Sequence, residues 1–217
     1  MSQDNIASRL DAIRVTLPDG VGLVAVSKFH PAEAVMEAYE AGQRAFGESR
    51  VQELEQKVDR LPSDIRWHFI GHVQTNKLSR LIGRVALIES VDSLRLLSMI
   101  DRLSAERGVV TRVLMQVHVA AEETKFGFDP DELVGWFASR GFESLQATHI
   151  CGIMGMATNT DDEKRVRDDF RRIADTRRRI LEAAPDLRGF DTVSMGMSDD
   201  YPAAIECGST LVRVGTA

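Results

Sequence analysis

Short apolar runs alternate with amphipathic segments along almost the whole chain, beginning with the run at 21–27. A short apolar run bounded by turn residues is typical of a strand that is buried on both faces. Segments with apolar residues three or four positions apart are typical of helices that bury one side. The pattern predicts strands at 21–27, 44–47, 67–71, 85–89, 112–119, 145–152, 191–194 and 211–214. It predicts helices at 6–13, 32–41, 49–58, 75–81, 93–106, 131–139, 162–183 and 200–206.

The alternation of strands and helices indicates an α/β fold, because strands separated by helices pair in parallel through right-handed crossovers. Eight such strands in 217 residues predict a single-domain (β/α)₈ TIM barrel that covers residues 1–217. A doubly wound open sheet is the alternative, but it usually has fewer strands and a glycine signature at its switch point. No helix is predicted after the last strand. We expect the extra N-terminal helix at 6–13 to occupy that position, since the first and last strands are neighbours in a closed barrel.

Composition and charge exclude several classes of function. The chain is 43% hydrophobic and 28% charged, which is ordinary for a globular protein. Its formal net charge of -6 argues against a general binder of nucleic acid or anionic membranes. No apolar stretch is long enough to span a bilayer, and no signal-peptide core is seen, so we expect a cytoplasmic protein. Cys151 and Cys207 lie far apart, which argues against a disulfide framework or a structural zinc site.

Lys28 ends the first predicted strand, and Pro31 follows shortly after. We expect this lysine at the edge of the low-dielectric core, where burial favours the neutral amine. A neutral amine can attack a carbonyl carbon to form a Schiff base. The alternative is a surface lysine that only ends a strand. Lys125 is a competing amine at another strand end, and Lys77 is a further one.

Two loops rich in small and hydroxyl residues are candidates for a phosphate site. In a (β/α)₈ barrel, sites form at the C-terminal ends of the strands, and phosphate groups bind after strands seven and eight. The loop from Ser194 to Ser198 follows the seventh predicted strand, and Gly215 and Thr216 follow the eighth. Such residues expose backbone N–H groups and supply hydroxyl donors to an anion. Either loop alone is better explained as an ordinary turn, but two of them on adjacent strands favour a phosphate group.

Arg213 lies within the last predicted strand, between Val212 and Val214. If the valines face the helices, Arg213 faces the barrel interior. A buried guanidinium needs a partner because it does not lose its proton. Two interpretations remain open: a structural salt bridge to an acid on another strand, such as Glu89, and a contact with a bound ligand.

The chain contains no motif for metal binding, nucleotide binding or nucleophilic hydrolysis. His68, His118 and His149 fall within predicted strands at spacings that match no metal-ligand pattern, so we expect them in the core or lining the barrel interior. There is no phosphate-binding GxxxxGK[ST] loop and no GxSxG nucleophile elbow. We therefore assign no metal ligand and no catalytic residue.

Several blocks of sequence, in order, resemble one known family. They are LVAVSKFHP at 23–31, FGESRVQE at 46–53, WHFIGHVQTNK at 67–77, KFGF at 125–128, SMGMSDD at 194–200 and ECGSTLVRVGTA at 206–217. With the lysine in place, they make the chain similar to the pyridoxal 5'-phosphate homeostasis proteins, the YggS/PROSC-like family. The chain departs from that family at Ser49, where asparagine is common, and lacks the few residues that usually follow the final Gly-Thr-Ala stretch.

The resemblance implies a barrel like the N-terminal domain of alanine racemase, with pyridoxal 5'-phosphate (PLP) held as a Schiff base on Lys28. It implies that Ser194, Gly215 and Thr216 hold the phosphate and that Arg213 faces the pyridine nitrogen. An arginine there does not hand over a proton, so the ring stays neutral and is a weak electron sink. Racemases of this fold also use a second domain, for which this chain has no length.

These expectations favour a carrier or regulator in PLP homeostasis over a dedicated enzyme. The alternatives are a PLP-dependent amino-acid racemase or lyase with modest activity, a cofactor-free aldolase that binds a sugar phosphate, and an interaction scaffold. The expected partners are PLP itself and enzymes that require PLP, with no nucleic acid and no membrane. The resemblance favours a monomer.

Overall fold

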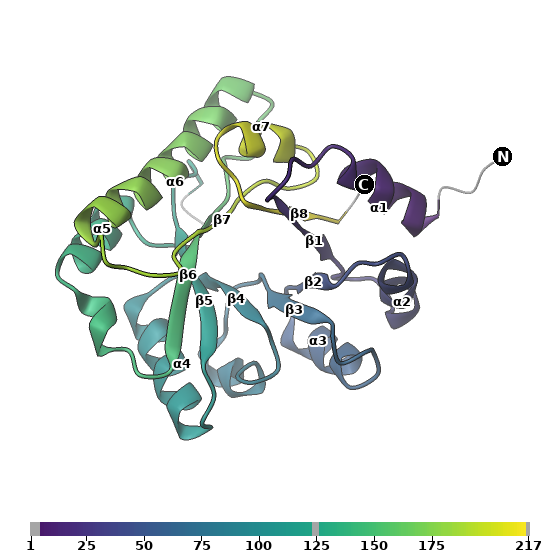
Figure 1. The fold of residues 1–217 in the computed structure, drawn as a ribbon, viewed down its shortest axis with the longest axis horizontal. Coiled ribbons are helices and arrows are strands. Elements are labelled where there is room, and N and C mark those ends of the chain that lie inside the picture. The colour runs from purple at the N-terminus through teal and green to yellow at the C-terminus, as the bar shows by residue number, and fades with distance from the viewer. Residues whose placement is uncertain (1–4, 123–125, 216–217) are drawn as a thin grey trace.

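The protein is a closed barrel in which strands that are neighbours in sequence are also neighbours in space (Figure 1). The computed structural model describes residues 5–122 and 126–215. The strands are β1 (Gly22–Val26), β2 (Ala45–Glu48), β3 (Arg66–Phe69), β4 (Leu87–Val91), β5 (Thr111–Val117), β6 (Thr148–Gly155), β7 (Thr192–Ser194) and β8 (Leu211–Val214). All pairings between these strands are parallel, and β8 pairs with β1 to close the ring. The predicted (β/α)₈ barrel is confirmed.

Helices surround the barrel and connect successive strands. They are α1 (Ile6–Arg14), α2 (Ala32–Glu40), α3 (Val51–Val58), α4 (Leu94–Glu106), α5 (Pro130–Ala138), α6 (Glu163–Ala183), α7 (Tyr201–Glu206) and the 3₁₀ helices η1 (Thr75–Arg80) and η2 (Gly141–Ser144). Side-chain oxygens of Asn5, Ser93, Asp129 and Asp162 accept backbone N–H groups at the starts of α1, α4, α5 and α6. These caps satisfy donors that have no partner within a helix, which explains why the helices begin there.

The side chains of the strands alternate between two environments. Those that face the helices form the main core, in which Phe46, Phe69, Phe137 and Phe170 are fully buried. Those that face the barrel axis form a smaller apolar cluster of Leu87, Leu114, Cys151 and Met154, together with buried polar residues. The interior polar residues gather near the C-terminal ends of the strands, where a barrel of this kind carries its site.

Two strands lie later in the chain than the periodicity predicts. β6 runs to Gly155 instead of ending at Gly152, so Met154 is a strand residue and not part of the following loop. Gly152 has φ +153°, and a Cβ at this position would lie 1.8 Å from the Thr192 carbonyl oxygen. The glycine therefore permits a close approach of β7, with a shift in register to β5, and the strand continues past it. β4 similarly runs to Val91 instead of ending at Glu89.

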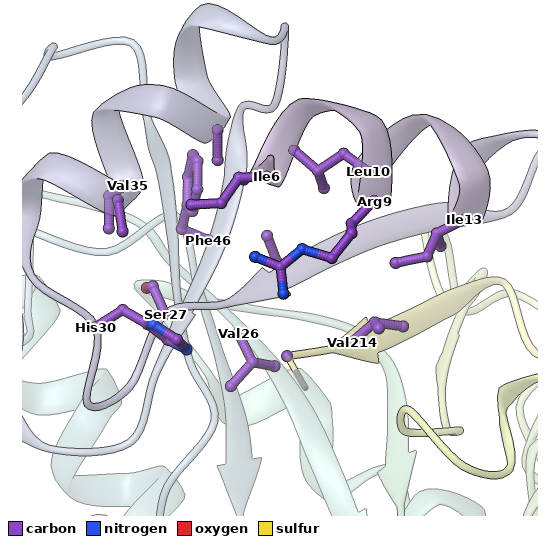
Figure 2. Close-up of a pocket in the computed structure, with 14 residues that line it drawn as sticks. Ile6, Arg9, Leu10, Ile13, Val26, Ser27, His30, Val35, Phe46 and Val214 are labelled. Atoms are coloured by element: carbon purple, nitrogen blue, oxygen red, sulfur yellow. The ribbon is translucent and has the colours of Figure 1, made fainter. Parts of the chain in front are cut away.

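Helix α1 covers the outer face of β1 and β8, the first and last strands, which pair to close the barrel (Figure 1). Ile13 packs with Val212 and Val214 of β8. Figure 2 shows Leu10 and Ile13 projecting from α1 above Val214, beside a pocket of about 120 Å³. The helix that precedes the first strand thus occupies the place of a helix after the last strand, as the sequence predicts.

The packing of α1 predicts a clear loss of stability for Leu10→Ala. Leu10 is only 6% exposed and belongs to the main core, so truncation adds to the pocket already beneath α1. We expect the free energy of unfolding, measured with urea, to fall by about 2–3 kcal/mol. Val15→Ala, at the 83% exposed residue that follows the same helix, should change it by less than about 0.5 kcal/mol. Equal effects of the two substitutions would contradict the covering role of α1.

Candidate functional site

Three adjacent strands bring most of the predicted site residues to one rim of the barrel. β1 pairs with β8, with Val24 opposite Arg213, and β8 pairs with β7, with Leu211 opposite Ser194. Lys28 follows β1, and Gly215 follows β8. The predicted phosphate residue Thr216 and the competing amine Lys125 lie outside the described residues. The site is therefore built at the junction of β7, β8 and β1.

Lys28 lies in a turn and is exposed, so the expected burial of its side chain is wrong. The strand pairing of β1 ends at Ser27, whose N–H donates to the Gly47 carbonyl. The His30 N–H then donates to the Ser27 carbonyl across a distance of 3.1 Å, which closes the turn around Lys28 and Phe29. The amine is thus presented at the rim, where a carbonyl group from solution can reach it.

A buried polar network lies below this rim, inside the barrel. The Arg213 side chain is 4% exposed and donates from Nη1 to the Ser194 hydroxyl at 2.5 Å and from Nη2 to the Gly155 carbonyl at 3.3 Å. The Ser194 hydroxyl donates to Glu89 Oε2 at 2.6 Å, and His68 Nδ1 lies 2.6 Å from Glu89 Oε1. Arg213 Nη1 is 3.7 Å from Glu89 Oε2. The salt bridge considered for Arg213 is therefore present.

The charges in this network stabilise one another. Burial alone would raise the pKa of Glu89, but His68, Arg213 and Ser194 favour the carboxylate and hold its pKa below the ordinary value. Burial lowers the pKa of Arg213, while Glu89 and Asp200 oppose that change. An arginine starts from so high a pKa that it stays charged, so the barrel holds a buried cation whose nearest negative charge is Glu89.

The loops after β7 and β8 are joined by a regular set of hydrogen bonds. The Met195 N–H donates to the Leu211 carbonyl, and the Arg213 N–H donates to the Gly196 carbonyl. One step further, the Gly215 N–H donates to the Ser198 hydroxyl at 3.2 Å. Ser198 thus takes the place that a backbone carbonyl would have in a longer strand pair, and it brings a hydroxyl beside Gly215.

Ser198, and not Ser194, is the loop hydroxyl beside Gly215. Ser194 is fully buried within β7, and its hydroxyl is engaged by both Glu89 and Arg213. The phosphate contact predicted for Ser194 stays a prediction. The structure shows the Ser194 hydroxyl directed to Glu89 and Arg213, whereas the Ser198 hydroxyl lies beside Gly215.

The rim has the shape and the donors that a phosphorylated aldehyde requires. A Cβ at position 215 would lie 2.8 Å from the Val26 Cβ, so only glycine leaves this space free. Asp200 Oδ1 accepts the Met197 N–H at 2.6 Å and so fixes the loop that carries Ser198. Lys28 follows β1, which pairs with β8, and the Arg213 guanidinium lies inside the barrel on β8, so the described residues fit PLP.

Within residues 5–122 and 126–215, no cluster of His, Cys, Asp and Glu suited to a metal ion is found, and no helix is both long and apolar enough to cross a bilayer. Of the three histidines predicted within strands, His68 belongs to the interior network, and His118, just after β5, has its Nε2 3.0 Å from the Glu122 carbonyl oxygen. His149 is exposed, so the expectation that all three lie in the core or barrel interior is wrong for that residue.

The chain is similar to known proteins over nearly its whole length. Residues 1–217 match the family profile of the alanine racemase N-terminal domain. The pyridoxal phosphate homeostasis protein of Haemophilus influenzae is 35% identical over 202 residues, which cover 91% of this chain and 83% of that protein. PipY of Synechococcus elongatus, in its structure with PLP bound, is 38% identical and has a TM-score of 0.90 over 98% of both chains.

An alanine racemase of Clostridium difficile is 16% identical and has a TM-score of 0.77, covering 98% of this chain and 55% of the racemase. That likeness concerns the fold, since the racemase has a further region that this barrel does not match. Nearly the full chain matches the family profile, and it also matches the homeostasis proteins and the PipY structure. The chain belongs to the family of pyridoxal phosphate homeostasis proteins, built on the barrel of the alanine racemase N-terminal domain.

Proposed function

We propose that this chain binds PLP in the homeostasis of that cofactor and holds it as a Schiff base on Lys28. The observation that carries the proposal is the meeting, at one rim, of an exposed amine after β1 with the hydrogen-bonded loops after β7 and β8. The Lys28 nitrogen adds to the aldehyde carbon, a C=N bond forms, and one water molecule leaves.

The other residues of the rim bind the phosphate and the pyridine nitrogen of PLP. The Ser198 hydroxyl accepts the Gly215 N–H and can donate its own proton to the phosphate, and Gly215 and Thr216 stay predicted members of this group. Arg213 lies below them, held by Ser194 and Glu89, and offers the pyridine nitrogen only a donor that keeps its own proton. We infer that Ser194 orients Arg213 and that Ser198 takes the phosphate contact in its place.

A carrier role suits this rim better than a dedicated enzyme. Phe29 and Met197, on loops of the rim, are 66% and 44% exposed. Catalysis usually requires a site that closes and excludes water, whereas an open rim permits exchange with other proteins. The chain acts as a monomer that stores PLP and supplies it to enzymes that require it.

The test is to incubate the purified protein with PLP, record the visible absorbance, reduce with borohydride and map the modified peptide by mass spectrometry. We expect a visible band and a single reduced adduct on the peptide that contains Lys28. A protein that gains no adduct, or one modified at Lys77 or Lys125 instead, would overturn the proposal.

The two serines near β7 should respond differently to substitution. We expect Ser198→Ala to weaken PLP binding about tenfold, since a hydrogen bond to a charged phosphate is worth about 1.5 kcal/mol. Its affinity for pyridoxal, which lacks the phosphate, should not change. Ser194→Ala should instead lower the free energy of unfolding, because it leaves Arg213 and Glu89 without a shared partner. Loss of phosphate-dependent affinity in Ser194→Ala alone would return the phosphate role to Ser194.

A further inference from the structure

Two side chains of α3 hold the two backbone groups that flank Lys28. Lys57 Nζ donates to the Ser27 carbonyl at 2.8 Å. Glu53 Oε2 accepts the Phe29 N–H at 2.8 Å. Glu53 and Lys57 are one helical turn apart and therefore lie on the same side of α3. A single helix thus contacts the chain immediately before and immediately after the lysine.

We propose that Glu53 and Lys57 are positioning residues that fix the backbone of Lys28 at the rim and so set how fast its amine combines with the cofactor. The inference rests on the proposed attachment of PLP to Lys28. Neither residue contacts the cofactor. Each acts through a hydrogen bond to the Lys28 turn.

The contact from Lys57 comes from a buried ion pair that is costly to form. Lys57 Nζ lies 2.6 Å from Glu48 Oε1, the Ser27 hydroxyl donates to the same oxygen at 2.7 Å, and the two charged side chains are 7% and 0% exposed. Glu48 Oε2 is buried and has no hydrogen-bond partner among the residues that the structure describes. A buried ion pair adds little net stability, because desolvation offsets the attraction, and its best-attested use is to specify one arrangement. Here the arrangement it specifies is the position of Ser27.

The contact from Glu53 holds a residue in an unfavourable backbone conformation. Phe29 has φ +67°, a region that costs a non-glycine residue about 1 kcal/mol or more. Its ring is 66% exposed, so burial does not hold it there. The Arg50 guanidinium lies 4.7 Å from the ring centroid and also contacts Glu53 Oε1, at 3.4 Å. Such a conformation persists only where its surroundings determine it, and the first turn of α3 supplies those contacts.

The consequence for Lys28 is a fixed backbone with an exposed side chain. The amine then explores only the rotamers of one anchored side chain, at the rim that also carries Ser198 and Gly215. Holding a nucleophile near the carbon that it attacks raises the rate of attack, because less orientational freedom is lost in the transition state. Releasing the turn should therefore slow the attachment even where the fold persists.

The experiment measures the rate of adduct formation after mixing with PLP, by visible absorbance and by timed borohydride trapping of the Lys28 peptide. Glu53→Met removes the acceptor for the Phe29 N–H, and we expect the rate to fall about tenfold. Glu53→Gln keeps an acceptor oxygen and should restore the rate to within about twofold. Glu55→Met, on the same helix, loses a contact with Arg80 that lies away from the turn, and should leave the rate unchanged.

A second variant tests the Lys57 contact without leaving an unpaired buried charge. Replacing both members of a buried ion pair by apolar residues of similar size is often neutral for stability, so Glu48→Leu with Lys57→Met should fold. We expect this double variant to form the adduct about tenfold more slowly, at unchanged thermal stability. Wild-type rates in both Glu53→Met and the double variant would overturn the inference while leaving Lys28 as the attachment site. Failure of the wild-type protein to form any adduct would instead overturn the proposed function.

Discussion

Lys28→Ala is expected to abolish the visible band that forms with PLP and the borohydride-stable adduct. The substitution removes the amine that the C=N bond requires, and no neighbouring side chain lies in the same turn to replace it. Binding without the covalent bond should persist through Ser198 and Gly215, with an affinity at least about a hundredfold weaker, a loss of ~2.7 kcal/mol. Spectroscopic titration measures the first loss, and equilibrium dialysis against PLP measures the second.

Stability separates this loss from damage to the fold. Lys28 is exposed, so its removal should change the free energy of unfolding by less than about 0.5 kcal/mol. Lys77→Ala and Lys125→Ala are matched controls that delete the two competing amines, and both should retain the band. A band that survives in Lys28→Ala and disappears in either control would place the attachment elsewhere.

Glu89→Ala is expected to cost about 3–5 kcal/mol of stability, the largest effect that the structure predicts for one substitution. Glu89 is fully buried and accepts from His68 and Ser194 while it faces Arg213 at 3.7 Å. Truncation leaves a guanidinium inside the barrel without its carboxylate. The penalty for an unpaired buried charge exceeds the modest net gain of forming the pair, which is why breaking the pair has so strong an effect.

For a chain of this size, 1 kcal/mol corresponds to about 2–4 °C in the unfolding temperature, so Glu89→Ala should lower it by roughly 10 °C. Calorimetry or circular dichroism measures the shift. Glu55→Ala, which removes a half-buried partner of Arg80, provides the control and should cost about 1 kcal/mol or less. A loss that small for Glu89→Ala would show that the interior network is not an ion pair that the fold depends on.

The architecture was predictable because the alternation of strands and helices has few solutions. Parallel strands place all their C-terminal ends on one side of a barrel, so the sequence alone predicts that Lys28, Arg213 and Gly215 lie together. The strand ends were less predictable. A glycine normally suggests a stop, but Gly152 lies within β6, where it allows β7 to approach closely.

The finer organisation of the site depended on contacts that no local pattern contains. The exposure of Lys28 follows from a turn that begins at Ser27, and that turn is held by Glu53 and Lys57. In the sequence, Glu53 and Lys57 are ordinary helix residues, because the sequence does not reveal which side of a helix contacts a particular loop. The interior partners of the Ser194 hydroxyl, Glu89 and Arg213, likewise become evident only in the structure.

The pairing of β1 with β8 joins segments from opposite ends of the chain, with Gly22 opposite Leu211. Contacts between such distant segments are slow to form, because the entropy of closing a long loop is lost before the contacts are gained. The proposed PLP site lies across this junction, with Lys28 on one side and Gly215 on the other. A ligand that contacts both sides favours the closed ring by mass action. On the ribosome, a nascent chain would therefore acquire its cofactor only after the last strand has emerged.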